Sequence, residues 1–320
     1  MNESPIPPPP PAGREEALRH PSIVLPPRPV EAPRGMAAKL AVVLEMIKFR
    51  HSVFALPFAL SAMLVAARGW PSLWVTFWIV AACVAARSMA MAYNRVVDRA
   101  FDARNPRTRD RALPAGLLTV RFAWGFVILS GAAFLFCAAM LNGLCLLCAP
   151  AVVAILLGYS HCKRFTRATH YVLGLALGLA PLGAWVAVRG TLAGLPVSLG
   201  LGVLFWTAGF DILYATLDAE VDRREGLFAL PSGLGIARAL WIARGTHALA
   251  AVCFAGFLWT SDLGGGAWGA GAICLTLLTA QHFLVRAHDL SRVGPAFFTF
   301  NAVISLLFLA GCAVETLVRG

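Results

Sequence analysis

Two short polar stretches of an otherwise apolar chain carry carboxylates at helical spacing. In AYNRVVDRAFD, Asn94, Asp98 and Asp102 follow one another at four-residue intervals, and in DILYATLDAEVD the pair Asp218 and Asp222 repeats that interval. At about 100° per residue, side chains four positions apart project from one face of a helix. Magnesium prefers oxygen ligands and is commonly held by one or two carboxylates together with substrate phosphates. The two stretches therefore predict a site that holds Mg²⁺ ions over a diphosphate.

Basic residues near these stretches are candidates for binding the phosphate oxygens that the metal ions leave free. Arg87 lies seven residues before the first stretch, on nearly the same helix face, and Arg107 and Arg111 follow it. Lys163 and Arg164 lie in a separate polar segment, GYSHCKRF. Because guanidinium and ammonium groups bind phosphate through charged hydrogen bonds, we predict that these residues bind substrate. The apolar tail of the same molecule would enter from the lipid.

The elements that must position these residues are apolar helices. Of the 320 residues, 59% are hydrophobic and 13% are charged, a composition typical of a membrane protein. Nine apolar runs approach the ~20 residues that a helix needs to cross a bilayer. They fall at about 52–69, 72–93, 120–140, 143–161, 171–188, 196–217, 242–260, 266–285 and 296–317. The first contains Pro57, which membrane helices tolerate when neighbours satisfy the freed backbone groups. We therefore predict an all-α membrane protein with nine transmembrane helices.

The basic residues also predict how the chain is oriented. Most of the 27 Lys and Arg residues precede the first predicted span or lie in the loops after every second span. The other side of the membrane holds Arg68, Arg189 and Arg319. Because cytoplasmic loops carry the excess of Lys and Arg, we expect a multi-pass protein of the plasma (inner) membrane. Its N-terminus and both acidic stretches would face the cytoplasm. The net charge of +11 follows from this asymmetry and suits anionic lipid, so no nucleic-acid partner is expected.

Asp211 extends the second acidic stretch. On a continuous helix it lies within about 20° of both Asp218 and Asp222. Carboxylates close to hydrocarbon are costly unless they are paired or bind cations. Solvated helix ends, neutralised by neighbouring arginines, would account for one such stretch. Two matching stretches, each closing a helix on the same side of the membrane, favour a cation site.

Residues 1 to 38 differ in composition from the rest of the chain. Prolines are concentrated there, as in PIPPPPP, and the charges are scattered without an apolar period. Such a segment cannot bury a core, so we predict a disordered arm, followed by one transmembrane domain over residues 39 to 320. The arm lacks the continuous apolar segment of a secretory signal, so no cleavage is expected.

The two acidic stretches also resemble the motifs of a known family. NRVVDRAFD is similar to the NxxxDxxxD motif of the UbiA-type intramembrane prenyltransferases, and DILYATLDAEVD resembles their second motif, in which a tyrosine precedes a DxxxD pair. TRDRALPAG and YSHCKRF add to the similarity, which covers about residues 40 to 317. The resemblance implies nine transmembrane helices around a central cavity. It also implies Mg²⁺ bound through both motifs and transfer of a polyprenyl group from its diphosphate to an acceptor.

The resemblance also assigns roles to single residues. The positions that match the metal ligands of the family are Asn94, Asp98, Asp102, Asp218 and Asp222, and the four Asp are the expected catalytic residues. Asp211 and Tyr214 match positions that flank the second motif and are expected to contact substrate. MIKFRHSVFALPFAL resembles the first-helix segment of quinone-pathway members, in which a basic residue lies near the pocket. Lys48 is therefore expected to bind the acceptor.

The resemblance leaves two classes of acceptor open. The chain is most similar to members that act like a 4-hydroxybenzoate polyprenyltransferase, which implies an aromatic hydroxy-acid acceptor and respiratory quinone biosynthesis. Members that use 4-hydroxybenzoate commonly continue the second motif with Lys-Ser-Thr, whereas this chain reads RREGLFALPSGLG. FALPFAL and GFDILYATLDAEVDRREGL are closer to a subgroup linked to prenylation of a dihydroxynaphthoate in a menaquinone route.

A function of another class is an ion-coupled secondary transporter, since intramembrane ionisable residues also mark ion pathways. Transporter sites usually lie near the middle of the membrane on broken helices. The acidic residues of this chain cluster at one interface beside basic loops, which favours the transferase. We expect the partners to be polyprenyl diphosphate, an aromatic acceptor and membrane lipid, without an obligate protein partner.

Overall fold

The structure, a computed structural model, describes residues 35–194 and 196–319, which fold into helices joined by short loops. The long helices are α4 (Leu73–Arg104), α5 (Val120–Leu141), α6 (Gly143–Cys162), α7 (Thr169–Arg189), α8 (Val197–Ala215), α11 (Ile236–Thr260), α12 (Gly265–Leu284) and α14 (Asn301–Arg319). The shorter elements are α2 (Met36–Met46), η1 (Phe49–Phe54), α3 (Leu56–Ala67), η2 (Thr216–Asp218), α9 (Ala219–Arg224), α10 (Leu230–Leu234), α13 (Val293–Pro295) and η3 (Ala296–Phe300).

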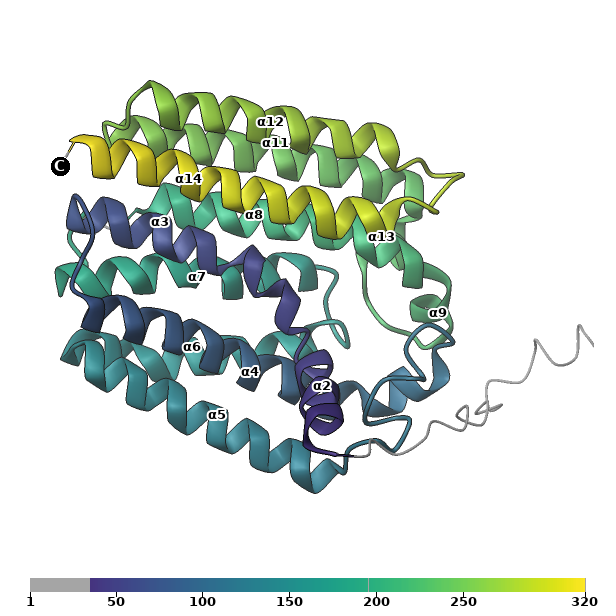
Figure 1. Ribbon diagram of the computed structural model, residues 1–320. Coiled ribbons are helices and arrows are strands. Elements are labelled where there is room, and N and C mark those ends of the chain that lie inside the picture. The colour runs from purple at the N-terminus through teal and green to yellow at the C-terminus, as the bar shows by residue number, and fades with distance from the viewer. Residues whose placement is uncertain (1–34, 195, 320) are drawn as a thin grey trace, which may run out of the picture.

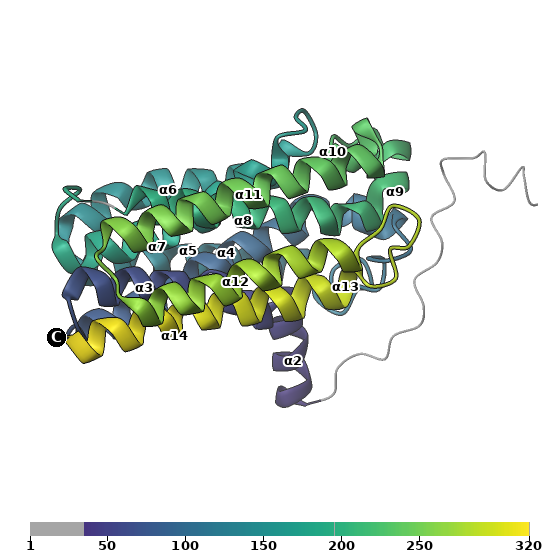
Figure 2. The same cartoon turned by 90° about the horizontal axis from the view of Figure 1, so that it is seen from above.

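The long helices run side by side in one bundle (Figure 1). Eight helical segments of the described chain are long and apolar enough to cross a membrane, and they coincide with eight of the nine predicted spans. The C-terminus lies at one end of the bundle, and α9, α10 and α13 lie at the other (Figures 1 and 2). Seen from above, α2 projects from the bundle (Figure 2). It begins at Met36, so residues 36–38 of the predicted arm are helical instead of disordered, and residues 1–34 of that arm lie outside the described residues.

The first predicted span, 52–69, is the shorter apolar segment Ser52–Ala67, which η1 and α3 share. Pro57 lies in the first turn of α3, where its missing N–H breaks no helical hydrogen bond. At ~1.5 Å per residue the 12 residues of α3 extend about 18 Å, less than the ~30 Å of a bilayer core. The proline therefore marks where the regular helix begins, instead of lying within a longer one.

The first acidic stretch lies on the extended end of α4. Ser72 caps this helix by accepting a hydrogen bond from the Val75 backbone N–H at 3.3 Å, and the helix continues for 32 residues. At ~1.5 Å per residue that is about 48 Å, so α4 is considerably longer than a bilayer core is thick. The predicted span ended near residue 93, and the remaining turns carry the acidic stretch as regular helix. The structure thus agrees with the predicted common face of this stretch.

The second acidic stretch does not lie on one continuous helix, contrary to the angles expected for Asp211, Asp218 and Asp222. The α-helix α8 ends at Ala215, a 3₁₀ turn occupies Thr216–Asp218, and α9 then begins. The Thr216 hydroxyl donates to the Leu213 carbonyl at 2.7 Å, a local bond that competes with the regular helical pattern. Because a 3₁₀ turn winds more tightly than an α-helix, the three carboxylates leave the chain at different angles from those predicted.

Glycines allow α7 and α8 to approach closely. A Cβ on Gly174 would overlap the backbone carbonyl of Leu204, and a Cβ on Gly178 would lie against the Gly200 carbonyl. Small residues commonly form such contacts in membranes, where close packing replaces the hydrophobic effect as a driving force. This contact fixes α8, which carries Asp211 and Tyr214 at the start of the second motif, against α7.

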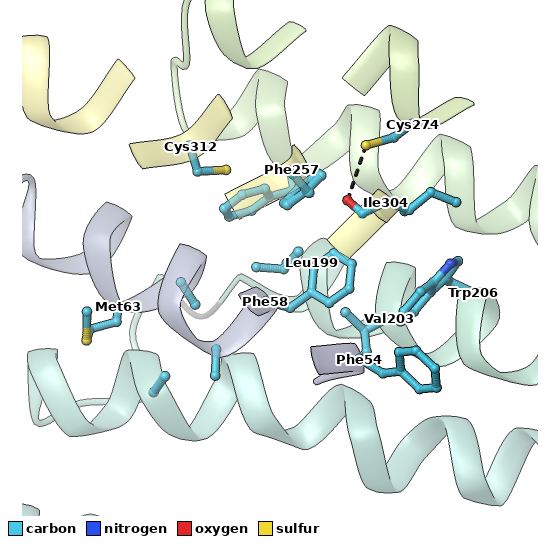
Figure 3. Close-up of a cluster of buried hydrophobic side chains, with 14 of the residues drawn as sticks. Phe54, Phe58, Met63, Leu199, Val203, Trp206, Phe257, Cys274, Ile304 and Cys312 are labelled. Carbon is cyan, nitrogen blue, oxygen red and sulfur yellow. Dashed lines mark hydrogen bonds between the residues drawn. The ribbon is translucent and has the colours of Figure 1, made fainter. Parts of the chain in front are cut away.

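On its other side α8 packs into an aromatic core with α3, α11, α12 and α14 (Figure 3). The rings of Phe58 and Trp206 meet edge to face with centroids 5.1 Å apart, and Phe58 stacks on Phe254 at 5.4 Å. Trp206 is fully buried, and its backbone carbonyl lies 3.1 Å from Nε2 of the buried His247. The position of α8 along the bundle is therefore set by contacts on both of its sides.

Candidate active site

Asp98 lies at the centre of the first motif and is almost fully buried, with 4% exposure. Lys163, just beyond the end of α6, donates to Asp98 Oδ2 at 2.7 Å. The Asn94 amide donates to the same oxygen at 3.0 Å and lies 3.4 Å from the Ser160 hydroxyl. One turn of α4 and the end of α6 thus converge on one carboxylate oxygen.

Asp102 is bound in a similar way from the loop that follows α4. The Arg111 guanidinium donates to Asp102 Oδ1 at 2.7 Å. The Thr108 hydroxyl donates to the Asp102 backbone carbonyl at 3.1 Å, which holds the loop against the end of the helix. Each of the two motif-one Asp residues therefore has its own basic partner, and both partners were predicted as phosphate-binding residues.

Asp218 of the second motif is bound by the same loop. Arg107 donates from Nε to Asp218 Oδ1 at 2.9 Å and also pairs with Oδ2, while Asn105 donates to Oδ1 at 2.9 Å. Arg107 also donates to the Tyr214 hydroxyl at 2.9 Å. Burial opposes its charge, but the hydrogen bond and negative charge of Asp218 outweigh this and raise the pKa of Arg107 above its ordinary value. The predicted motif residues Asp218 and Tyr214 thus share one cation.

A second ion pair joins the regions that carry the two motifs. Arg104, the last residue of α4, donates to both oxygens of Glu225, with distances of 2.9 Å from Nε to each oxygen and 2.6 Å from Nη2 to Oε2. Glu225 directly follows α9. A bidentate pair of this kind restricts orientation as well as distance, so it fixes the end of α4 relative to α9.

Three cations surround the ring of Phe101, which lies between the two motif-one Asp residues. The Arg104, Lys163 and Arg164 charges lie 5.2, 5.7 and 5.3 Å from the ring centroid. Arg164 also donates to the Val97 backbone carbonyl at 2.8 Å. Cations over an aromatic face are attracted by the ring quadrupole. The arrangement gathers positive charge beside the carboxylates, as an anionic substrate requires.

Asp222 and Asp211 have other surroundings than the carboxylates described above. Asp222 is half-buried on α9, and its backbone carbonyl accepts from the Leu227 N–H at 2.8 Å. Asp211 lies on α8, where its Oδ2 is 2.7 Å from Nδ1 of His170. Asp211 is thus partnered by a residue from α7, away from the loop that binds Asp218.

The donor atoms fit divalent metal ions. Asp98 Oδ1 and Asp102 Oδ2 are buried, and neither has a hydrogen-bond partner within the described structure. An unsatisfied buried carboxylate oxygen is costly, and it is the hard ligand that Mg²⁺ prefers. The described residues contain no group of three or more His, Cys, Asp or Glu close enough to hold a metal on their own. A site of one or two carboxylates completed by substrate phosphates agrees with both observations.

An apolar cavity of about 360 Å³ lies beside α4, and its lining reaches Met91, about two helical turns before Asp98. Tyr159 lines it and directly precedes Ser160, the neighbour of the Asn94 amide. The cavity continues between α4, α5, α6 and α7 to Leu141 and Leu192, and Arg87 is the charged residue in its lining. Arg87 donates from Nη2 to the Lys48 backbone carbonyl at 3.0 Å, while its buried Nε has no partner in the described part of the chain.

Lys48 lies near this cavity but apart from the motif carboxylates. Its backbone is left-handed, with φ 49° and ψ 51°, in the turn between α2 and η1. The ammonium group pairs with Glu45, three residues earlier. Among the described residues, Lys48 is therefore connected to the other predicted site residues only by its backbone carbonyl, which accepts the hydrogen bond from Arg87.

Four site residues were not found from the sequence: Asn105, Glu225, His170 and Arg95. Asn105 and Glu225 directly follow the two motif helices, and that proximity was the available signal. Arg95 is buried and donates to the Met46 carbonyl at 3.2 Å, and His170 contacts Asp211 across two helices. Neither of these last two contacts has a pattern along the chain, because both join segments that only folding brings together.

The fold and the site define a multi-pass helical membrane protein with paired acidic motifs at one end and an apolar cavity beside them. The chain belongs to the UbiA prenyltransferase family, whose model matches residues 55–306. It is 31% identical to a 4-hydroxybenzoate octaprenyltransferase of Salmonella paratyphi C over 78% of this chain and 85% of that protein. It is 32% identical to the enzyme of that name from Xanthomonas oryzae pv. oryzae, over 79% and 84% of the two chains.

Solved structures agree with this assignment. The apo structure of a UbiA homologue from Aeropyrum pernix K1 matches with a TM-score of 0.77 and 33% identity, over 83% of this chain and 98% of that one. A UbiA homologue from Archaeoglobus fulgidus bound to GPP and Mg²⁺ shares the fold at a TM-score of 0.69 and 21% identity, over 86% and 99%. The chain is therefore an aromatic prenyltransferase, and the transporter interpretation is set aside.

Proposed function

We propose that the protein transfers a polyprenyl group from its diphosphate to an aromatic hydroxy acid of the 4-hydroxybenzoate type, in respiratory quinone biosynthesis. The observation that carries the proposal is the pair of unsatisfied carboxylate oxygens, on Asp98 and Asp102, next to an apolar cavity. A diphosphate with a long apolar tail matches this combination of a polar end and an apolar channel. The names of the curated relatives support the acceptor, and the Archaeoglobus structure with GPP and Mg²⁺ supports the metal.

The metal ions would be held by Asn94, Asp98, Asp102, Asp218 and Asp222, the motif residues of both stretches. When bound, they would stabilise the negative charge that develops on the diphosphate as the allylic C–O bond breaks. Lys163 and Arg111, which neutralise Asp98 and Asp102, are placed to turn their charges toward phosphate oxygens.

The apolar cavity supplies the second requirement of this reaction. An allylic carbocation is trapped by water, so the channel beside the carboxylates must be dry for an aromatic ring to attack instead. The ring carbon beside the phenolic hydroxyl forms the new C–C bond, and the proton on that carbon then passes to an oxygen of the released diphosphate or to a motif Asp. The lining of the cavity is apolar apart from the end at Ser52, Arg87 and Tyr159, which agrees with this requirement.

The acceptor carboxylate requires a cation outside the metal site. Arg87 lines the polar end of the cavity, and its guanidinium donates to the Lys48 backbone carbonyl. The Lys48 ammonium, which pairs with Glu45, would have to turn from Glu45 to reach an acceptor there. A carboxylate brought into the bundle without such a partner would be costly. We therefore assign the acceptor to this end. A dihydroxynaphthoate is the second candidate acceptor, since the second motif continues as RREGLFALPSGLG, whereas members that use 4-hydroxybenzoate commonly continue it with a Lys-Ser-Thr stretch.

The location of the reaction is proposed to be the cytoplasmic face of the inner membrane. The loops that hold the motif cations follow α4 and α6, where the Lys and Arg residues of the chain concentrate. The excess of basic residues in cytoplasmic loops supports this orientation.

The test is product formation by the purified full-length chain in detergent. We would incubate it with Mg²⁺, labelled polyprenyl diphosphate and separate phenolic acids, including 4-hydroxybenzoate and a dihydroxynaphthoate, and identify products by mass spectrometry. We expect a C-prenylated 4-hydroxybenzoate, no product in excess chelator, and recovery on adding Mg²⁺. If only the dihydroxynaphthoate gave a product, it would replace 4-hydroxybenzoate as the proposed acceptor. Full activity in excess chelator would exclude the metal-dependent mechanism.

A further inference from the structure

His170 lies near the start of α7 and is 2% exposed, yet the proposed mechanism gives it no role. Its Nδ1 is 2.7 Å from Asp211 Oδ2 on α8. Its Nε2 is 3.3 Å from the backbone nitrogen of Leu230, the first residue of α10. The imidazole thus lies where three segments meet, and one of them carries the second acidic motif.

The two hydrogen bonds define which nitrogen carries the proton. The Leu230 N–H can only donate, so Nε2 must be the accepting nitrogen of a neutral ring. The proton then lies on Nδ1 and is donated to the Asp211 carboxylate. The backbone of α10 therefore selects the tautomer that binds Asp211.

The segment that follows the second motif is attached to the same region. The Phe228 N–H donates to the Lys163 backbone carbonyl at 2.6 Å, next to the Leu230 bond to His170. Lys163 is the partner of Asp98 in the first motif. Both motifs are thus connected to residues 228–230 through the α6–α7 loop and the start of α7.

We propose that His170 is a positioning residue for the second motif, acting through Asp211, an inference that rests on the proposed function. Asp211 is the last motif carboxylate on regular α8, because the helix changes to a 3₁₀ turn at Thr216. With its carboxylate fixed by His170, the final turn of α8 presents Tyr214 and Asp218 to Arg107 in one orientation. Without that bond, Asp211 could rotate toward the carboxylates of the same site.

Two substitutions of His170 separate this role from simple packing. The amide nitrogen of Asn lies close to the place of Nδ1, so His170→Asn can still donate to Asp211 while losing the acceptor for Leu230. His170→Leu loses both bonds at similar volume. We expect His170→Leu to lower kcat about tenfold or more and to raise the Mg²⁺ concentration needed for half-maximal activity. We expect His170→Asn to stay within about threefold of the wild type.

Asp211→Ala completes a double-mutant cycle. If His170 acts through Asp211, adding His170→Leu to Asp211→Ala should change kcat by less than about twofold, because residues that act as a unit are not additive. Equal losses with and without Asp211, or equal losses in His170→Asn and His170→Leu, would assign His170 to the support of α10 and overturn the proposal. Folded yield and detergent Tm of each variant identify losses that come from unfolding.

A binding measurement distinguishes failure of this inference from failure of the proposed function. Polyprenyl diphosphate with Mg²⁺ should raise the Tm of the wild type, since a ligand that binds the folded state stabilises it. If the wild type forms no prenylated product with any acceptor, the proposed function is wrong, and the inference is still decided by this shift. It should be retained in His170→Asn and reduced in His170→Leu, and an unchanged shift in His170→Leu would overturn the inference.

Discussion

Asp98 and Asp102 each give one carboxylate oxygen to a cation and keep the other buried without a hydrogen-bond partner in the described structure. If these Asp residues served only to end a helix, burying the second oxygen without a hydrogen bond would cost free energy and bring no compensating interaction. Asp218 differs, since Arg107 and Asn105 together occupy both of its oxygens. The two motifs are therefore unequal at residue scale, with open ligand positions on the first and a bound carboxylate on the second.

Asp→Asn substitutions at Asp98 and Asp218 test these roles separately. Each removes a negative charge but keeps the shape, so we expect turnover to fall about a hundredfold or more while the folded yield in detergent stays nearly unchanged. Asp110→Asn is the matched control, because Asp110 lies in the same polar region but is exposed and pairs only at 3.9 Å with Arg109. Steady-state rates and size-exclusion yield decide the outcome. Loss of yield with normal turnover per folded molecule would indicate a structural role.

Lys48→Met tests the acceptor end of the cavity. The ammonium pairs with Glu45 in the structure, and our proposal requires it to turn to the acceptor carboxylate when the acceptor binds. We therefore expect the apparent KM for the acceptor to rise about tenfold or more, the loss of a charged hydrogen bond worth ~1.5–3 kcal/mol, with little change in the KM for the diphosphate. Glu45→Gln is the control, since it frees the Lys48 ammonium from its ion pair and should leave the acceptor KM unchanged or lower it. A rise in the diphosphate KM alone would assign Lys48 to the phosphate site.

At the scale of elements, the sequence predicted the first motif better than the second. Four-residue spacing defined one face of α4 correctly, because that helix continues as a regular α-helix to Arg104. The same arithmetic was wrong for α8, where the helix changes to a 3₁₀ turn at Thr216. A hydroxyl bond and the ion pairs with Arg107 and Arg104 accompany that turn. The partners of these ion pairs are more than 100 residues apart along the chain, so helical periodicity carries no information about them.

The glycine contact between α7 and α8 provides a test at this scale. Gly174→Ala would place a methyl group against the Leu204 carbonyl, so the helices must separate or shift. Overpacking of this kind costs roughly 1–3 kcal/mol, and we expect the detergent Tm to fall by several degrees. Gly183→Ala on the same helix is the matched control. It meets no atom within 4 Å, so its Tm should stay the same or rise slightly. Equal Tm values for the two variants would contradict the close contact.

At the scale of the whole molecule, composition and charge were sufficient to predict a helical bundle with its chemistry at one end. The loops that bind the motif carboxylates, and the segments α9, α10 and α13, gather at the end opposite the C-terminus (Figures 1 and 2). The position of α2 was not predicted. It is held by two bonds from α4, where Arg95 donates to the Met46 carbonyl and Arg87 donates to the Lys48 carbonyl. Both acceptors are backbone atoms, which no sequence pattern identifies.

Two N-terminal deletions distinguish the role of the arm from the role of the contact between α2 and α4. Removing residues 1–34 leaves α2 and all site residues in place, so we expect membrane insertion and turnover within about twofold of the full chain.

Removing residues 1–47 also deletes the Met46 carbonyl, which leaves the buried Arg95 charge without its hydrogen-bond acceptor near the first motif. Because an unpaired buried charge is strongly destabilising, we expect this deletion to lower both the Tm and the turnover. Loss of activity in a correctly inserted 1–34 deletion would show that the arm takes part in the reaction. Full activity in the 1–47 deletion would show that α2 does not support the site.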